Sequence, residues 1–453
     1  MTKLPSNPAD SPLANTRYPS TGIVRRIYGN LAKLLGGKAI AGLISLAYMV
    51  IAVRALGPAD YGVLILVHTY TITVGGIIEF PGWQAVVRYG AQAAAANDFD
   101  RLVRLLRLTA LIEFAGGAVA VLTCALLARW IGPRLGWSPT ALAFSVPYSF
   151  AVLATIRSTA AGYLQLLGRF DLLGLQNLVP PAVRLMGALI AVGVGAGLRG
   201  FLIAWLVAAL AEWISMWILG LILARRHLAG HRLIGSARGA VEENPGIRWF
   251  MIAANADVTF GDLAQRLASL AVGWVLGPAS AGIYAVALRA TSIVTQPAGN
   301  LGQASYAELS RLIAAGGSGA DIRAAFGRAV TIALLLAAPL VLAATLFGRP
   351  IARLMAGPQF AEAGDVMPWL FVARAILLAA PPASAGLVAL GLPGASFRAN
   401  LVTSLGMLPL LPLLMMYFSL EGAGQYAVLQ GLCTSVMLGA VLWRHTRDPT
   451  SRS

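Results

Sequence analysis

Charged side chains are scarce in this sequence. Only 11% of its 453 residues are Asp, Glu, Lys or Arg, whereas 58% are hydrophobic. About a quarter of the residues in an ordinary soluble domain are charged. The chain also lacks any long polar interval between its apolar runs, since the longest covers only about residues 225–248. Its composition therefore excludes most soluble enzyme architectures and places any activity inside a membrane or at its surface.

Cysteine and nucleotide-binding motifs are also nearly absent. The two cysteines, Cys124 and Cys433, lie in separate apolar runs without a CxxC partner, so we interpret them as small core residues. No GxxxxGK[ST] loop occurs, because Ala32 stands where the first glycine before Gly37-Lys38 is required. We expect no cofactor, no metal site and no ATP hydrolysis by this chain.

Acidic residues are fewer than basic ones, and the net charge is +16. In a soluble protein this balance would favour nucleic acid, but here the basic residues gather in short loops between apolar runs. Lys and Arg in such loops resist translocation, so their distribution predicts that both termini lie in the cytoplasm and that no nucleic acid is bound. The exterior loops then hold only Arg54, Arg129, Arg134, Arg199, Arg349 and Arg353.

The two ends of the chain are polar. Residues 1–28 contain four prolines and lack the basic segment and cleavage site of a signal peptide. We expect a disordered cytoplasmic tail at 1–28 and a second cytoplasmic tail at 444–453.

Apolar runs bounded by Gly, Pro and Arg predict an all-α polytopic membrane protein with about 12 transmembrane helices. They lie near 34–53, 61–82, 105–128, 140–163, 172–198, 200–223, 249–275, 281–305, 327–347, 363–389, 396–419 and 421–443. We predict an N-terminal six-helix lobe at 29–223, a cytoplasmic linker at 224–248 and a C-terminal six-helix lobe at 249–443.

A short repeat links the two halves. Residues 56–62 read LGPADYG after the first predicted helix, and residues 276–282 read LGPASAG after the seventh. Either turn alone could be a simple helix connector. Because six helices separate the copies, both turns lie on the same side of the membrane, which indicates a parallel pseudo-two-fold repeat about an axis along the membrane normal.

The LGPADYG turn, which follows an apolar span and Arg54, resembles the polysaccharide transporter family, whose members are O-antigen and exopolysaccharide repeat-unit flippases. That family is part of the multidrug, oligosaccharidyl-lipid and polysaccharide exporter superfamily. The stretch 168–173 (GRFDLL), followed by Pro180-Pro181 and Arg184, is similar to the loop and fifth helix of such proteins.

The resemblance implies a V-shaped pair of lobes with helices one, two, four, seven, eight and ten facing a central cavity. It implies a non-enzymatic, multi-pass protein of the bacterial cell inner membrane. Its activity would be to translocate a polyprenyl-diphosphate-linked oligosaccharide from the cytoplasmic to the periplasmic leaflet by alternating access, for lipopolysaccharide, surface or exopolysaccharide biosynthesis. Membrane lipids, a polysaccharide polymerase and export machinery would be its partners.

Several ionisable residues fall inside the predicted spans, although each costs at least about 2.5–3.5 kcal/mol at bilayer depth. A guanidinium offers paired donors and keeps its proton, so arginine suits a diphosphate or an acidic sugar. We predict Arg157, Arg289 and Arg374 as substrate-binding residues, because the resemblance places their helices at the cavity and no acidic residue of their own lies nearby. Further substrate-binding candidates are Arg184, Lys38 and Arg266.

Structural roles compete with each of these assignments. Arg184 could be neutralised by Glu113 or Glu212, and Arg157 could be a snorkelling anchor near the cytoplasmic end of its helix. Lys38 could likewise reach the membrane interface.

A coupling ion would need carboxylates within the membrane. Asp257 and Asp262, with Asn255 nearby, are the best candidate set for ion coupling. Polar packing between helices is an equally good interpretation, and Asp262 with Arg266 has the i,i+4 spacing of a helical ion pair. A proton gradient, a sodium gradient and downhill polymerisation remain open as energy sources.

Two other functions are alternatives to the flippase. A multidrug exporter of the same superfamily should have an acidic or aromatic cavity, which the arginines argue against. A membrane glycosyltransferase or polymerase would need a catalytic constellation, and the only DxD-like run is Asp98-Phe99-Asp100 in a cytoplasmic amphipathic segment. Such enzymes also carry a long exterior loop, which this sequence lacks.

Overall fold

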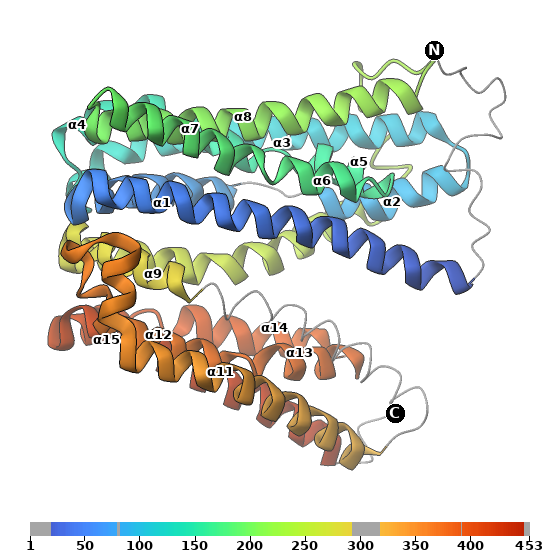
Figure 1. Cartoon of the computed structure of the whole chain (residues 1–453). Helices are drawn as coiled ribbons and strands as arrows, with labels where there is room; N and C mark the ends of the chain where they lie inside the picture. Colours follow the sequence, from blue (N-terminus) through green and yellow to red (C-terminus); the bar gives the residue numbers. More distant parts are fainter. Residues whose placement is uncertain (1–19, 79–81, 292–317, 391, 448–453) are drawn as a thin grey trace. The chain divides into compact units, whose positions relative to one another are not determined.

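The structure is a computed structural model that describes residues 20–78, 82–291, 318–390 and 392–447 (Figure 1). Side chains are not described at 20–35, 253–262, 336, 389, 393 and 447. Every regular element among the described residues is helical, so the predicted all-α fold class is confirmed. The first helix begins at Ser20, inside the segment for which we expected a tail.

The helices follow one another along the chain, and the segment 228–246 between α8 and α9 is the longest fully described connection. They are α1 (Ser20–Ile78), α2 (Trp83–Ala95), α3 (Phe99–Arg134), α4 (Pro139–Tyr148), α5 (Ser158–Leu166), α6 (Phe170–Gln176), α7 (Val179–Gly193), α8 (Gly197–His227), α9 (Ile247–Ala290), α11 (Gly319–Ala356), α12 (Ala363–Leu377), α13 (Ala380–Ala389), α14 (Pro393–Leu401) and α15 (Leu410–Arg447). Tight 3₁₀ turns occupy Ser149–Thr155 and Pro358–Phe360, and a π-helical turn occupies Val402–Gly406.

Nine helical segments among the described residues are long and apolar enough to cross a membrane. The first, Gly36–Ile78, has 43 residues and is about 65 Å long at about 1.5 Å per residue, more than twice the ~30 Å hydrocarbon core. Non-helical residues divide the longest elements, at Gly57 in α1, Gly277 in α9, Phe347 in α11 and Ser419 in α15. The polytopic fold is therefore confirmed, whereas the count of twelve crossings stays a prediction.

The chain forms two compact units, which we call unit 1 and unit 2. Unit 1 contains Met1–Ala55, Tyr70–Pro133 and Ser138–Thr259, and unit 2 contains Leu56–Thr69, Arg134–Trp137 and Phe260–Ser453. In Figure 1 most of unit 1 is blue to green, and most of unit 2 is yellow to red.

Unit 1 includes the segment between α8 and α9, which folds back onto the start of α3. Arg101 donates from Nε to the Asn244 side-chain oxygen at 3.1 Å, and Arg104 pairs with Glu243 at 2.8 Å. The two arginines are three residues apart, so they share one face of the helix. The predicted linker 224–248 is thus held by side chains of an earlier helix.

Unit 2 contains both copies of the repeated turn. Gly57 (φ 68°, ψ 178°) and Gly277 (φ 85°, ψ 173°) adopt the same backbone conformation, which is essentially restricted to glycine. The equal conformation at equal positions of the repeat confirms the internal repeat predicted from the sequence.

The second glycine of each turn packs against the proline of the other turn. A Cβ at Gly62 would overlap the carbonyl oxygen of Pro278, and a Cβ at Gly282 would overlap that of Pro58. The contact is reciprocal, as expected between two equivalent copies. Both glycines are therefore required by close backbone approach.

Candidate substrate-binding residues and buried ion pairs

The predicted span 140–163 is a broken helix. α4 ends at Tyr148, the 3₁₀ turn Ser149–Thr155 follows, and α5 begins at Ser158. Pro147 lies near the end of α4, where its missing N–H and fixed φ weaken the helical ladder. The break leaves the first N–H groups of α5 without helical acceptors inside an apolar span.

Glu113 of α3 satisfies these donors. Its two carboxylate oxygens accept the backbone N–H groups of Ser158 and Thr159, the latter at 2.8 Å. Glu113 is only 1% exposed. A carboxylate at a helix N-terminus is stabilised by the amide dipoles and by charge-assisted hydrogen bonds, so Glu113 has a structural role at the break.

Arg157 lies directly before α5 and forms an ion pair with α8. Its Nη2 is 2.7 Å from Glu212 Oε1, its Nη1 donates to Gln176 Oε1 at 3.2 Å, and its Nε donates to the Ala154 carbonyl at 2.9 Å. Arg157 carries no acidic neighbour of its own in the sequence, but the fold supplies one from another helix. The side chain is directed into unit 1 and has the contacts of an internal pair.

Arg184 of α7 lies among aromatic side chains. Its Nη1 is 3.3 Å from the Tyr48 hydroxyl, and its guanidinium carbon is 5.8 Å from the Tyr48 ring centre and 5.5 Å from that of Trp205. Tyr48 and Trp205 meet edge to face at 5.2 Å. Cation–π attraction therefore contributes to holding this buried cation.

Arg374 of α12 is an arginine inside an apolar span of unit 2. Its Nη2 donates to the Gln265 side-chain oxygen at 3.1 Å, and its side chain is partly buried in an apolar span. Among the described side chains its partner is a neutral amide, not a carboxylate. A neutral partner contributes no negative charge to offset that of Arg374.

The other predicted site residues are more dispersed. Lys38 is exposed on α1, Arg289 is partly buried at the end of α9, and Arg266 is partly buried next to Gln265. The side chains of Asp257 and Asp262 lie outside the described residues, as do Asn255 and Glu79, so the ion-coupling assignment stays a prediction.

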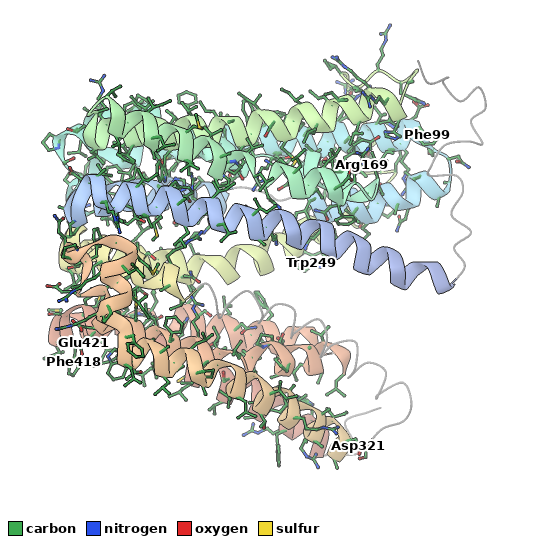
Figure 2. The ribbon with its side chains drawn as sticks, in the orientation of Figure 1. Phe99, Arg169, Trp249, Asp321, Phe418 and Glu421 are labelled. Atoms are coloured by element: carbon green, nitrogen blue, oxygen red, sulfur yellow. The ribbon has the colours of Figure 1, made fainter. Side chains whose placement is uncertain are left out.

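The GRFDLL motif forms a local structural turn. Gly168 has a φ of 68°, and Arg169 pairs with Asp171 two residues later at 2.8 Å. Figure 2 labels Arg169 at the start of α6. The two side chains are 40% and 41% exposed, so the motif ends α5 and begins α6 without forming a buried site.

Sequence reasoning missed the neutral partners of the arginines. Tyr48, Gln176 and Gln265 are polar residues within apolar runs, and this is the one signal by which they could have been found. Their pairing with particular arginines depends on helix contacts that the sequence pattern does not specify.

We expect Glu113→Gln to lower the free energy of unfolding by about 1–3 kcal/mol, because the amide group would direct a donor at a backbone N–H donor. Thermal unfolding in detergent measures this change. Glu421→Gln, at an exposed position, is the matched control and should leave the midpoint unchanged. Equal midpoints for the two variants would contradict the capping role.

Together, the apolar helices and the cations held inside them define a polytopic membrane protein. A family model described as "Polysaccharide biosynthesis protein" matches residues 51–365. The chain belongs to this family, and the resemblance inferred from the LGPADYG turn is confirmed.

The chain is also similar to a curated protein and to solved structures. The "Inner membrane protein YghQ" of Escherichia coli (strain K12) is 28% identical over 360 residues, which cover 76% of this chain and 97% of that protein. A multidrug resistance MATE family transporter of the MOP superfamily, in an inward-facing conformation, matches with a TM-score of 0.68 at 13% identity, covering 90% of this chain and 96% of that one.

The lipid II flippase MurJ, in an inward closed conformation, matches with a TM-score of 0.67 at 12% identity, covering 89% of this chain and 86% of that one. At these identities the solved structures show the fold. The protein is thus a multi-pass inner membrane protein with the fold of this transporter superfamily.

Proposed function

We propose that this protein is a flippase that moves a polyprenyl-diphosphate-linked oligosaccharide from the cytoplasmic to the periplasmic leaflet. The sugar would serve surface or exopolysaccharide synthesis, in keeping with the polysaccharide biosynthesis family. Two six-helix lobes, 29–223 and 249–443, would alternate in access, with both termini in the cytoplasm. A polymerase and export machinery on the far side would consume the product.

The observation that carries the proposal is Arg374. It lies in a membrane-spanning segment and, among the described side chains, donates to the neutral Gln265 instead of a carboxylate. A cation in an apolar span is costly unless an anionic group offsets its charge. A diphosphate accepts paired guanidinium hydrogen bonds and supplies negative charge.

The other basic residues differ in how well their surroundings suit substrate binding. Arg184 lies against the rings of Tyr48 and Trp205, and its guanidinium could also bind an anionic group. Arg289 and Arg266 are partly buried on α9, and Lys38 is exposed on α1. Arg157 is the weakest candidate, because Glu212 already neutralises it.

The test is complementation of a flippase deletion strain, with the membrane content of each variant measured. We expect Arg374→Ala to lower surface polysaccharide roughly tenfold or more and to let lipid-linked precursor accumulate, since a hydrogen bond to a charged group contributes about 1.5–3 kcal/mol. Arg374→Lys keeps the charge without the paired donors, so it should retain partial activity.

Arg349→Ala is the matched control for this experiment. Arg349 also belongs to unit 2, but it is 63% exposed and pairs with Asp365, and such surface pairs contribute about 0–1 kcal/mol. It should complement like the wild type. A wild-type chain that restores no polysaccharide of several glycan types, yet protects cells against cationic drugs, would favour the multidrug exporter.

A further inference from the structure

Unit 1 contains a cavity of about 680 Å³ that none of the predicted substrate residues lines. α3, α5, α8 and the segment 233–238 form its walls, which are mainly apolar, with Leu106, Ala110 and Trp217 among them. Its volume lies in the range of about 300–1,000 Å³ that is typical of small-molecule sites. All of its lining residues belong to unit 1, and the cavity is partly open to the surroundings.

Arg107 holds the wall segment 233–238 in place. The guanidinium of Arg107 donates to the carbonyl oxygens of Leu233 at 3.1 Å and Ser236 at 2.9 Å, and also to that of Arg232. Three backbone acceptors on one cation hold this wall in place. The cavity is therefore a built feature of the fold and not a gap beneath a loose loop.

A buried hydroxyl beside the cavity has no hydrogen-bond partner among the described residues. Tyr163 of α5 lines the cavity and is 2% exposed, and its hydroxyl oxygen has almost no accessible surface. Leaving a hydroxyl buried and unpaired costs about 1–3 kcal/mol. An oxygen atom of a bound molecule accepts this hydrogen bond once the Tyr163 side chain turns toward the cavity.

The rim of the cavity has the chemistry of a membrane interface. Arg238 lines the opening and is exposed, and Arg232 is exposed six residues earlier. Between them Ile234 is 91% exposed. An exposed apolar side chain flanked by cations is typical of a segment that lies among lipid headgroups.

We infer that this cavity binds an anionic phospholipid of the surrounding bilayer. An acyl chain lies along Leu106 and Trp217, an ester oxygen accepts the Tyr163 hydroxyl, and the phosphate lies near Arg238. The apolar walls, the unpaired hydroxyl and the cationic rim match the three parts of such a lipid in order. The site does not depend on the proposed flippase activity.

Native mass spectrometry of the purified full chain, titrated with dioleoyl phosphatidylglycerol or dioleoyl phosphatidylcholine, tests this inference. We expect phosphatidylglycerol to bind about fivefold more tightly, since one cation near an anionic headgroup contributes about 1 kcal/mol. Arg238→Gln should abolish that preference. Arg226→Gln, which removes an exposed arginine of α8 outside the cavity lining, should preserve it.

Tyr163→Phe removes only the hydroxyl and should weaken phosphatidylglycerol binding about fivefold, the size of one hydrogen bond. Without lipid it should melt no earlier than the wild type, because the hydroxyl has no partner to lose. Tyr426→Phe removes a similarly buried and unpaired hydroxyl in unit 2 and should leave lipid affinity unchanged.

Three results would overturn the inference. They are equal affinity for the two lipids, loss of thermal stability in lipid-free Tyr163→Phe, and preferential binding of an undecaprenyl phosphate probe that Tyr163→Phe and Arg238→Gln weaken in the same way. The last result would assign the cavity to a polyprenyl ligand.

Discussion

Replacing Arg157 with alanine is expected to lower the free energy of unfolding by about 1–3 kcal/mol. The substitution leaves Glu212 as a carboxylate without its cation, and a partly buried charge that loses its partner is destabilising. The two side chains are 32% and 15% exposed, and Glu212 lies 2.7 Å from Arg157. Gln176 would also lose its guanidinium donor, which adds to the effect.

Thermal unfolding of the purified protein in detergent measures this loss, and a second variant separates charge from packing. Arg157→Met combined with Glu212→Met removes both charges and should return to within about 1 kcal/mol of the wild type, since apolar replacement of a buried pair is often neutral. Arg169→Ala is the control, because its pair with Asp171 is largely exposed. A double variant as unstable as Arg157→Ala would contradict the pairing.

The same double variant distinguishes two roles of Arg157. If it recovers stability and also complements a flippase deletion, Arg157 serves only the internal pair. If it recovers stability but fails to complement, Arg157 contacts substrate as well.

Gly62→Ala and Gly282→Ala are each expected to lower the free energy of unfolding by about 3 kcal/mol or more. A methyl group at either position would overlap the carbonyl oxygen of the opposing proline, and the backbone must move to relieve it. The yield of monodisperse protein and the thermal midpoint measure the effect.

Gly439→Ala is the matched control. Gly439 lies within α15, and no atom approaches its Cβ position within 4 Å, so alanine should stabilise the helix by about 0.5–1 kcal/mol. If Gly62→Ala were as stable as Gly439→Ala, the two turns would not be in close contact.

The helices themselves were predictable because a bilayer leaves the backbone few options. Lipid offers no hydrogen bonds, so a long apolar run must satisfy its own backbone as a helix. Most predicted spans therefore coincide with observed helices, and the end of the span predicted at 281–305 lies outside the described residues. The break in α4–α5 was missed, since Pro147 alone does not show that Glu113 will cap the helix that follows.

The repeat was predictable for a different reason. Gly57 and Gly277 occupy a conformation that other residues avoid, and Gly62 and Gly282 have no room for a side chain. Sterics fix these residue types, so the pattern is visible in the sequence.

Partners of the charged residues were not predictable. Glu212 was a possible partner of Arg184, but the structure pairs it with Arg157. Arg184 instead contacts Tyr48 and Trp205 from two other helices. Local spacing identifies pairs within one helix, whereas these contacts depend on how separate helices pack.

The order along the chain of the segments that form the two units has a consequence for synthesis on the ribosome. Chains emerge from the N-terminus, so every residue of unit 1 is made before Phe260. The short segments Leu56–Thr69 and Arg134–Trp137 are made equally early but pack within unit 2. A nascent chain stalled near residue 260 would thus contain all of unit 1, while the two segments would lack the rest of unit 2 to pack against. Gly62 could contact Pro278 only after the seventh predicted span had been inserted.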